Sequence, residues 1–254
     1  PKSPRGSNRS PGGPSELHRS ERFACRRHRA YSIRSFVTLE ALLGDRVHSQ
    51  PSLRTTYRTD GGGIVHGLPD SVVAPKGPED VAQLLHWAQE SRTPITCRGG
   101  GLTTEGESVS TRGILLDLKS LHRLLEVDGN TAWVEAGMTW HQFAEALRPH
   151  GLDYLSGPLN MTSTIGGSLG IGGIDVNSPR FGCAADQAVE LEVVTPRGEI
   201  VRCREGDELF EQVLFGYGQF GVITKARMKV RPNRPMWTQY YLYHNIQTAI
   251  EDMT

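Results

Sequence analysis

The chain has 254 residues with 28 basic and 28 acidic side chains, so no global field favours binding to nucleic acid or to a membrane, and we expect neither partner. It has no run of 18 apolar residues that would span a bilayer, and no basic start followed by an apolar core that would mark a signal peptide. Its four cysteines are widely spaced, without a Cys-x-x-Cys pair, which favours reduced thiols in a cytoplasmic protein and no metal site.

The chain begins with a segment of low complexity. Residues 1–30 are rich in Ser, Pro, Gly and Arg and hold few aliphatic side chains. Such a segment buries too little apolar area to offset its ordering entropy, so we expect a disordered basic tail. Its arginines leave contact with nucleic acid open as an alternative. Residues 31–68 are expected to form an edge helix and lead-in, because Phe36, Leu39 and Leu43 have helical spacing.

The first strand and long helix are expected next. Residues 72–75 read as a strand, and Pro78 stands where proline opens a helix. Apolar residues then recur at i, i+3, i+4 and i+7, which predicts an amphipathic helix. A short strand at 95–97 delivers the chain into a glycine-rich turn at 98–106.

The second half alternates strands and helices. Strands are expected at 114–118 and 131–136, and Thr139 with Gln142 forms a capping box that starts a helix. The later expected elements are a glycine-rich turn at 164–174, a hairpin of strands at 189–194 and 199–203, a helix capped by Asp207, a third glycine cluster at 215–221 and a strand at 222–230. Helices interleaved with hairpin and crossover connections favour an α+β fold.

The two glycine-rich turns at 98–106 and 164–174 are the main functional signal. Glycine occurs where the backbone takes positive φ or comes close to another backbone or a ligand. Consecutive amides in such turns form concavities that bind anions such as a pyrophosphate. Two of them on one domain indicate a long phosphate-bearing cofactor held along its length. Glycine-rich surface loops are the plain alternative.

Three familiar motifs match these turns poorly. Residues 101–108 have Walker A spacing, but Glu107 stands where a lysine would reach the phosphates, and we expect Glu105 and Glu107 to point outward. No Gly-x-Gly-x-x-Gly opens a helix after a strand, so the Rossmann fingerprint is absent. A Gly-x-Ser-x-Gly motif surrounds Ser168, but a polar segment precedes it instead of a buried strand. A serine hydrolase that uses Ser168 stays open as an alternative.

From about Asp60 to Pro232 the chain resembles the FAD-binding domain of the vanillyl-alcohol oxidase family, also called the p-cresol methylhydroxylase type. The segments that carry the resemblance, in the order of the family, are 69–81, 98–101, 164–174, 189–199 and 218–224. Within this family, the motifs most resemble those of cytokinin dehydrogenases and related bacterial oxidoreductases. The resemblance implies an α+β fold in which residues 69–235 form a PCMH-type FAD-binding domain of two α+β subdomains.

The same resemblance implies that residues 236–254 begin a substrate (cap) domain that is largely missing. Its first strand is expected to hold Trp237, Tyr240, Tyr241 and Tyr243. Because the chain starts at Pro1 and this last pattern is unfinished, we expect a fragment of a longer protein.

Carried over residue by residue, the resemblance implies a cofactor map. The backbone of the first turn would hold the pyrophosphate and approach the flavin, the second turn would line the opposite wall, and the closing strand would add one contact. The implied FAD-binding residues are Cys97, Gly99, Gly100, Gly101, Leu102, Thr103, Thr164, Gly170, Ile174 and Val222.

Two departures from the family change the expected chemistry. Many members attach the flavin through a histidine directly after the last glycine of the first turn, where this chain has Leu102, and residues 156–163 lack the cysteine anchor of another branch. We therefore expect non-covalent FAD. In cytokinin dehydrogenases an aspartate before the second turn acts on the substrate amine, but the aligned residue here is Leu159. We expect no cytokinin oxidation, and the sequence identifies no catalytic residue.

The function that the resemblance implies is that of an FAD-dependent oxidoreductase. Such an enzyme takes a hydride from an alcohol or amine carbon of a small organic substrate and passes electrons to oxygen or another acceptor. A flavin-binding domain without catalysis is the alternative.

Overall fold

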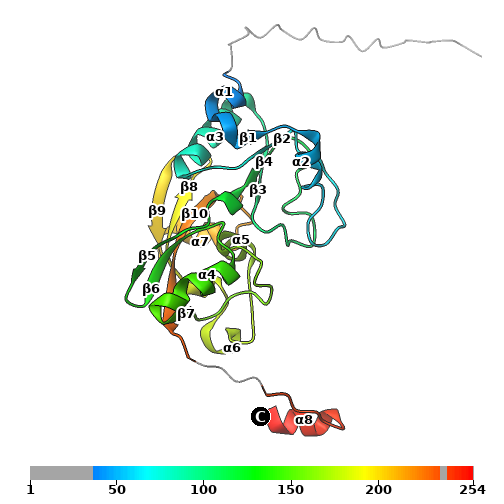
Figure 1. Ribbon diagram of the computed structural model, residues 1–254, viewed down its shortest axis with the longest axis vertical. Coiled ribbons are helices and arrows are strands. Elements are labelled where there is room, and N and C mark those ends of the chain that lie inside the picture. Colours follow the sequence, from blue (N-terminus) through cyan, green and yellow to red (C-terminus); the bar gives the residue numbers. More distant parts are fainter. Residues whose placement is uncertain (1–36, 235–238, 254) are drawn as a thin grey trace, which may run out of the picture. The chain divides into compact units, whose positions relative to one another are not determined.

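Two β-sheets, joined by one short connection, form the framework of the protein (Figure 1). The computed structural model describes residues 37–234 and 239–253. The predicted tail at 1–30 and the beginning of the edge segment, including Phe36, lie outside the described residues. The boundaries predicted after residues 30, 68 and 235 stay predictions.

The first sheet is mostly parallel and carries the first glycine-rich turn. Its strands are β1 (Val47–His48), β2 (Ser71–Val73), β3 (Ile95–Arg98) and β4 (Ile114–Asp117), in the spatial order β1-β2-β4-β3. β2 and β3 both run parallel to β4, and every residue of β2 and β4 is buried. Such strands need apolar cover on both faces, which explains their continuous runs of Val, Ile and Leu.

Helices α1 (Leu39–Leu43) and α3 (Pro78–Ser91) pack against this sheet. A further helix, α2 (Pro51–Thr55), follows β1 and has no buried residue. Pro78 opens α3 as expected, and the predicted apolar stripe faces inward to pack with residues of α1, β2 and β4. The short helix α1 lies within the segment where an edge helix was predicted, and it buries Leu39 and Leu43 against the same cluster.

The second sheet is antiparallel and centred on a long closing strand. Its strands are β5 (Leu124–Asp128), β6 (Thr131–Glu135), β7 (Leu152–Tyr154), β8 (Ala188–Val194), β9 (Ile200–Arg204) and β10 (Val222–Pro232). The spatial order is β5-β6-β10-β8-β9, and β7 pairs with the end of β10. The predicted hairpin is confirmed as β8–β9, with Val194 opposite Ile200.

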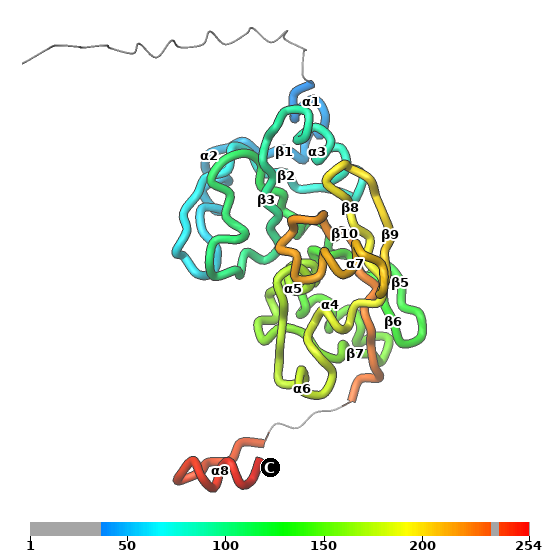
Figure 2. Tube along the Cα trace, turned by 180° about the vertical axis from the view of Figure 1, so that it is seen from behind, coloured from blue at the N-terminus to red at the C-terminus, as the bar shows by residue number. Residues whose placement is uncertain are grey.

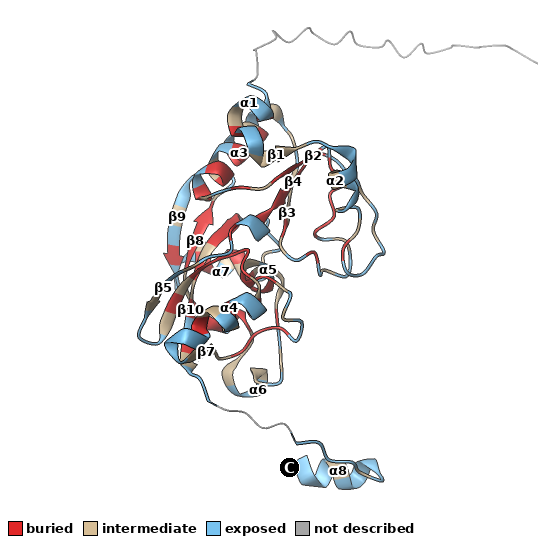
Figure 3. Ribbon diagram, viewed as in Figure 1, coloured by how far each residue is buried: buried red, intermediate tan, exposed pale blue. Residues whose placement is uncertain are grey.

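Helices α4 (Trp140–Leu147), α5 (Ile165–Ile171) and α7 (Glu208–Val213) pack against this sheet. The short helix α6 (Ser178–Phe181) follows α5 and has no buried residue. The capping box of Thr139 and Gln142 is present, so the predicted start of α4 is confirmed. Trp140, Phe143 and Leu147 are fully buried on one face of α4, where Figure 3 colours the helix red toward the sheet.

Short 3₁₀ helices complete the connections, at Gly44–Arg46, Leu118–Ser120, Arg148–His150 and Ala185–Gln187. Val194 and Val222, from the second sheet, belong to the hydrophobic cluster of the first sheet. The two subdomains therefore share packed core at the ends of β8 and β10, which determines where the strand ends and loops meet. The expected α+β architecture of two subdomains is confirmed.

Several local expectations differ from the structure. Residues 165–171 form helix α5 and not a turn, because Thr164 caps the segment and Gly166 packs closely against Ala136 after β6. Asp207 precedes α7 but its side chain caps nothing there, since it accepts from the Arg204 amide at 2.9 Å. Strands β5 and β7 and helix α6 are short and half-exposed, and they lack the periodic pattern that would have predicted them.

The strand expected around residues 237–243 is also wrong for the part that is described. Tyr240, Tyr241 and Tyr243 lie in irregular chain, and a helix, α8 (Ile246–Met253), follows them. A strand needs a partner for its backbone groups, and none of the described strands pairs with this segment. Trp237 lies outside the described residues. No helix in the described part of the chain has the length and apolar character to cross a membrane.

Candidate functional site

A cavity of about 170 Å³ lies where the two sheets meet, and we call it the inter-sheet cavity. Its wall comes mainly from residues within three segments, 97–108, 163–172 and 213–223, with Leu118 and Ala136 between them. All three glycine-rich segments of the sequence thus reach one site. Figure 2 shows, from behind, the chain around α5 beside the orange loop before β10, with β3 close by.

The first glycine-rich turn follows β3 and closes around the side chain of Arg98. The Arg98 guanidinium donates to the Ser108 carbonyl at 3.1 Å and to the Thr59 carbonyl at 2.9 Å. Gly101 has a φ of +68°, and a Cβ at this position would lie 2.5 Å from Arg98 Cζ. Only glycine fits here, because a side chain would meet both an unfavourable backbone conformation and a buried arginine.

The same turn presents a row of free amide groups. Within the described residues, the N–H groups of residues 100–103 donate to no other group, whereas the amides of Glu105 and Gly106 bond to carboxylates. Residues 100–103 also line the inter-sheet cavity. Successive unpaired amides in a turn of this kind form a concavity with positive potential, which suits an anion.

Asp60 fastens this turn from behind. Its carboxylate, in a residue only 7% exposed, accepts from the Thr103 hydroxyl at 2.7 Å, the Gly106 amide at 2.8 Å and the Gly62 and Gly63 amides at 3.2 Å. Burial alone would raise the pKa of this carboxyl, but these hydrogen bonds favour the charged form and hold the pKa below its ordinary value.

The second glycine-rich segment forms a different kind of wall. The amides at the start of α5 are already used: Ile165 donates to Met138, Gly166 to Ala136, and Gly167 to the Thr164 hydroxyl. The expectation that both turns offer free donors is therefore wrong for this segment. Its glycines allow close approach instead, because a Cβ on Gly166 would lie 2.8 Å from Ala136 Cβ.

The two glycine-rich segments touch each other. A Cβ on Gly99 would overlap the Thr164 hydroxyl, and a Cβ on Gly100 would lie 2.9 Å from the Thr162 carbonyl oxygen. By contrast, a Cβ on Gly170 meets nothing within 4 Å, and Gly170 lines the inter-sheet cavity. The first turn thus supplies donors, and α5 supplies a wall in which Gly170 adds no side-chain bulk.

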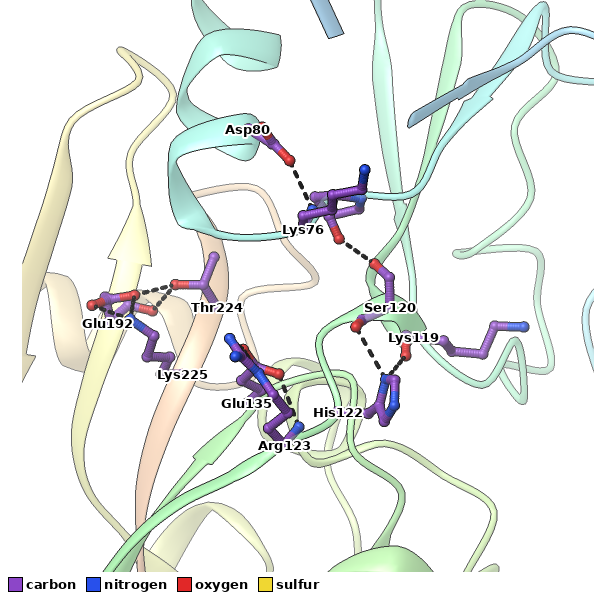
Figure 4. A network of polar contacts seen from close by, with 11 residues as sticks. Lys76, Asp80, Lys119, Ser120, His122, Arg123, Glu135, Glu192, Thr224 and Lys225 are labelled. Carbon is purple, nitrogen blue, oxygen red and sulfur yellow. Dashed lines mark hydrogen bonds and ion pairs between the residues drawn. The ribbon is translucent and has the colours of Figure 1, made fainter. Parts of the chain in front are cut away.

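The third wall comes from the loop before β10 and the beginning of that strand. β10 carries a bulge at Thr224, whose hydroxyl donates to the Glu192 carboxylate at 3.0 Å, and Val222 and Ile223 line the inter-sheet cavity just before this bulge. Bulges often re-aim side chains beside functional sites. Figure 4 shows Thr224, Glu192 and the neighbouring Lys225 in contact.

Cys97, a residue of β3, packs against the loop before β10. A Cβ on Gly218 would lie 3.9 Å from the Cys97 sulfur, an ordinary contact. Burial raises the pKa of the Cys97 thiol to about 11, so it is a neutral thiol at physiological pH. Cys97 is therefore a small, half-buried group in the wall and not a poised nucleophile.

All but one of the residues implied by the sequence line the inter-sheet cavity. They are Cys97, Gly99, Gly100, Gly101, Leu102, Thr103, Thr164, Gly170 and Val222. Ile174 does not line it; that residue is 67% exposed, and its carbonyl accepts from the Leu159 amide at 3.0 Å. The helix α5 explains the difference, because it ends at Ile171 and the chain then turns away from the wall.

Sequence reasoning missed other lining residues. Ala136 and Val213 lie at the ends of regular elements, where no pattern marks a wall position. Tyr217 had a signal, since it interrupts the third glycine cluster with a large side chain.

The two glutamates of the first turn were expected to point outward, away from a bound phosphate. Glu105 is exposed and does not line the inter-sheet cavity. Glu107 is exposed as well, yet it contributes to the wall, and its carboxylate accepts from the Glu105 amide at 3.0 Å.

The surroundings of Ser168 give this side chain a structural role. It is 3% exposed, and its hydroxyl accepts from the Trp140 indole at 2.9 Å. The described lining residues include no histidine that would activate it, so the geometry does not favour a serine hydrolase.

The residues present suit a phosphate-bearing cofactor. Free amides line one side, glycine backbone lines the other, and Arg98 places a buried positive charge behind the first turn. A family model described as an FAD binding domain matches residues 69–204. The chain belongs to this family. The resemblance to the PCMH-type, or vanillyl-alcohol oxidase, FAD-binding domain is thereby confirmed, and FAD is the cofactor of the family.

Known proteins support this assignment. The chain is similar to "Cytokinin dehydrogenase 3" of Oryza sativa subsp. japonica, with 33% identity over 211 residues, covering 78% of this chain and 40% of that protein. It is also similar to "Uncharacterized oxidoreductase ORF5 in fasciation locus" of Rhodococcoides fascians, with 30% identity over 214 residues, covering 81% and 48%. Its fold matches a solved alkyldihydroxyacetonephosphate synthase with a TM-score of 0.68 and 26% identity, covering 75% of this chain and 39% of that one. The chain spans less than half the length of these relatives.

Proposed function

We propose that the protein is an FAD-dependent oxidoreductase that oxidises a small organic substrate at an alcohol or amine carbon. The single observation that carries the proposal is the meeting of the free amides at 100–103 with the glycine-rich wall of α5 in one cavity of an FAD-binding domain. The names of the relatives, which are dehydrogenases and an oxidoreductase, agree with it.

In this proposal the residues of the chain divide the binding of FAD between them. The amides of Gly100, Gly101 and Leu102 would donate to the pyrophosphate, and Asp60 holds the turn in shape by accepting from Thr103 and Gly106. Gly170 keeps its part of the opposite wall free of a side chain, and Gly166 lets α5 approach Ala136 closely. When bound, FAD supplies the group that accepts a hydride from the substrate.

We propose that the chain holds FAD without a covalent bond. Leu102 lines the inter-sheet cavity at the position where many members of the family have a histidine, and an aliphatic side chain has no nucleophilic atom. The test is the visible spectrum before and after acid precipitation. We expect the flavin bands to move into the supernatant, whereas flavin that stays with the pellet would contradict non-covalent binding.

The substrate chemistry requires groups beyond those seen in the cavity wall. The ionisable lining residues in the described part of the chain are Cys97, Arg98, Glu107 and Tyr217. The pKa of the Cys97 thiol is raised to about 11, and Arg98 is bonded to two carbonyls, so neither is a poised base. This supports a second candidate function, a flavin-binding domain without catalysis.

Substrate-dependent bleaching of the flavin separates the two candidates. Anaerobic addition of small alcohols and amines to the yellow protein should reduce the absorbance near the flavin maximum, and air or another acceptor should restore it. Retention of full colour with every compound in such a panel would favour the non-catalytic domain. We propose a substrate other than a cytokinin, because Leu159 is 74% exposed and carries no carboxylate to meet an amine.

A further inference from the structure

The loop that precedes β10 contains an unusual backbone. Phe215 and Tyr217 have φ values of +55° and +54°, in the left-handed region that L residues rarely adopt. Aromatic residues in this region carry strain, and such strain persists where the surrounding structure over-determines it, often at ligand clamps.

Two hydrogen bonds hold the loop in this conformation. The Phe215 amide donates to the Leu169 carbonyl at 2.9 Å, and the Tyr217 amide donates to the Gly170 carbonyl at 3.0 Å. The loop is thereby fastened to the end of α5, so each aromatic side chain has a defined starting direction relative to the wall of the inter-sheet cavity.

Packing accounts for Phe215 but not for Tyr217. A Cβ on Gly172 would lie 3.0 Å from Phe215 Cε1, so the phenyl ring of Phe215 covers the chain just after α5. Tyr217 is 54% exposed, and within residues 37–234 and 239–253 its side chain has no hydrogen bond and no aromatic partner. The backbone of Tyr217 is thus held by a hydrogen bond, but no hydrogen bond or ring contact of its side chain in the described part of the chain explains why an aromatic residue stands at this strained position.

Tyr217 is also the one aromatic residue among the described residues that line the inter-sheet cavity. The other wall residues are small, aliphatic or polar. We propose that the ring of Tyr217 is the aromatic platform of this cavity and stacks on one of the two planar ring systems of FAD, the isoalloxazine or the adenine. Stacking on a partly exposed aromatic ring is the interaction that a planar heterocycle gains here and that aliphatic walls cannot supply.

The inference rests on FAD binding by the proposed oxidoreductase but not on its oxidation of a substrate, so binding alone tests it. Flavin-free protein is titrated with FAD, and protein and flavin fluorescence are followed. Tyr217→Leu should weaken FAD binding by about five-fold or more, because one aromatic stack is lost, while Tyr217→Phe should stay within about two-fold of the native protein. Flavin bound to the Leu variant should also be less quenched.

Two controls separate the ring from the backbone. Tyr217→Gly removes the strain together with the ring, so the flavin-free variant should unfold at the same or a higher temperature and still bind FAD weakly. Phe220→Leu also replaces an aromatic ring with leucine in the same loop, at a residue that is 45% exposed and does not line the cavity, and it should bind FAD like the native protein.

Titrations with FMN and with ADP identify the stacked ring. Loss of FMN affinity in Tyr217→Leu assigns the isoalloxazine, and loss of ADP affinity assigns the adenine. The proposal is overturned if Tyr217→Leu binds FAD as tightly as the native protein, or if Tyr217→Phe loses as much affinity as Tyr217→Leu. Failure of the native protein itself to bind FAD would instead refute the proposed function.

Discussion

At the scale of single residues, Asp60 determines the shape of the first glycine-rich turn. One buried carboxylate accepts from Thr103 and Gly106 within the turn and from Gly62 and Gly63 beside its own backbone. It therefore consumes the donors that point backward and leaves the amides of residues 100–103 for a ligand.

Replacing Asp60 with asparagine should loosen this turn. One side-chain oxygen becomes an NH₂ group that cannot accept from Thr103 or Gly106, and a mis-paired buried group costs about 1–3 kcal/mol. We expect a lower thermal midpoint and about ten-fold weaker FAD binding, measured by titration. Asp70→Asn is the matched control, because Asp70 accepts from the Gly113 amide at 2.7 Å and does not line the inter-sheet cavity. Equal loss of FAD affinity in both variants would contradict a specific role for Asp60.

The charge of Asp60 also predicts a pH dependence. Hydrogen bonds hold the pKa of the folded carboxyl below its ordinary value of 3.8, so the charged form stabilises the fold at neutral pH. This contribution is complete above the unfolded pKa and is lost as the pH falls through the folded pKa. The difference in unfolding free energy between the native protein and Asp60→Asn should shrink below about pH 4. A difference that stays constant down to pH 2 would be the contrary result.

Cys97 makes a second prediction at this scale. With a thiol pKa of about 11, alkylation of Cys97 by iodoacetamide should be very slow at pH 7 and should accelerate with pH up to that value. Bound FAD should slow it further, because Cys97 lines the inter-sheet cavity. Mass spectrometry of the Cys97 peptide gives the rate, and rapid labelling at pH 7 would contradict the raised pKa of this thiol.

At the scale of elements, α5 shows why glycines recur within a helix. Glycine weakens a helix relative to alanine, so these positions are explained by what lies beside them. Gly166 faces Ala136 at the end of β6, and Gly170 faces open space in the wall of the cavity. The same residue type thus serves packing at one position and ligand access at the other.

The two glycines should respond differently to alanine. Gly166→Ala forces a methyl group to within 2.8 Å of Ala136 Cβ, and overpacking of this kind costs about 1–3 kcal/mol. Gly170→Ala should leave the unfolding free energy unchanged or raise it by up to about 1 kcal/mol through helix propensity. It should nevertheless weaken FAD binding, because the methyl group enters the cavity. Thermal unfolding and FAD titration of both variants provide the measurement, and unimpaired FAD binding by Gly170→Ala would contradict this account.

At the scale of the whole molecule, the site depends on how the two sheets are held together. The chain crosses from β4 to β5 through residues 118–123, and Glu135 fastens the end of this connection. Its carboxylate, 2% exposed, accepts from the Arg123 amide at 2.8 Å and from the Arg123 guanidinium at 2.7 Å, as Figure 4 shows. A Cβ on Gly137 would overlap the Leu118 carbonyl, so the start of the same connection is closely packed too.

Removing the Glu135 carboxylate should therefore weaken FAD binding from outside the cavity. We expect Glu135→Ala to lower both the thermal midpoint and the FAD affinity, although Glu135 does not line the inter-sheet cavity. Arg123→Ala is the matched control: it removes an exposed guanidinium but keeps the backbone amide that Glu135 accepts from, so its effect should be smaller. If Glu135→Ala lowered stability without changing FAD affinity, the connection would have no influence on the site.

The sequence by itself determined much of this protein. Regular periodicity and capping residues predicted α3, α4 and the β8–β9 hairpin, because these signals are local and depend on neighbouring residues in the chain. Glycine clusters that resemble the motifs of the family predicted the FAD-binding domain and most of the cavity wall. A short, half-exposed strand such as β5 carries no such pattern, and its existence depends on the partner strand β6.

Only the tertiary structure decided how the glycines are used. Two segments that look alike as sequences become a turn with free amides and a helix with occupied ones, because Met138 and Ala136 present carbonyls to the start of α5. Ile174 lies outside the wall because α5 ends at Ile171 and the chain then turns away. Whether an amide is free depends on which acceptor lies opposite, and that acceptor comes from a distant part of the chain, which local sequence cannot reveal.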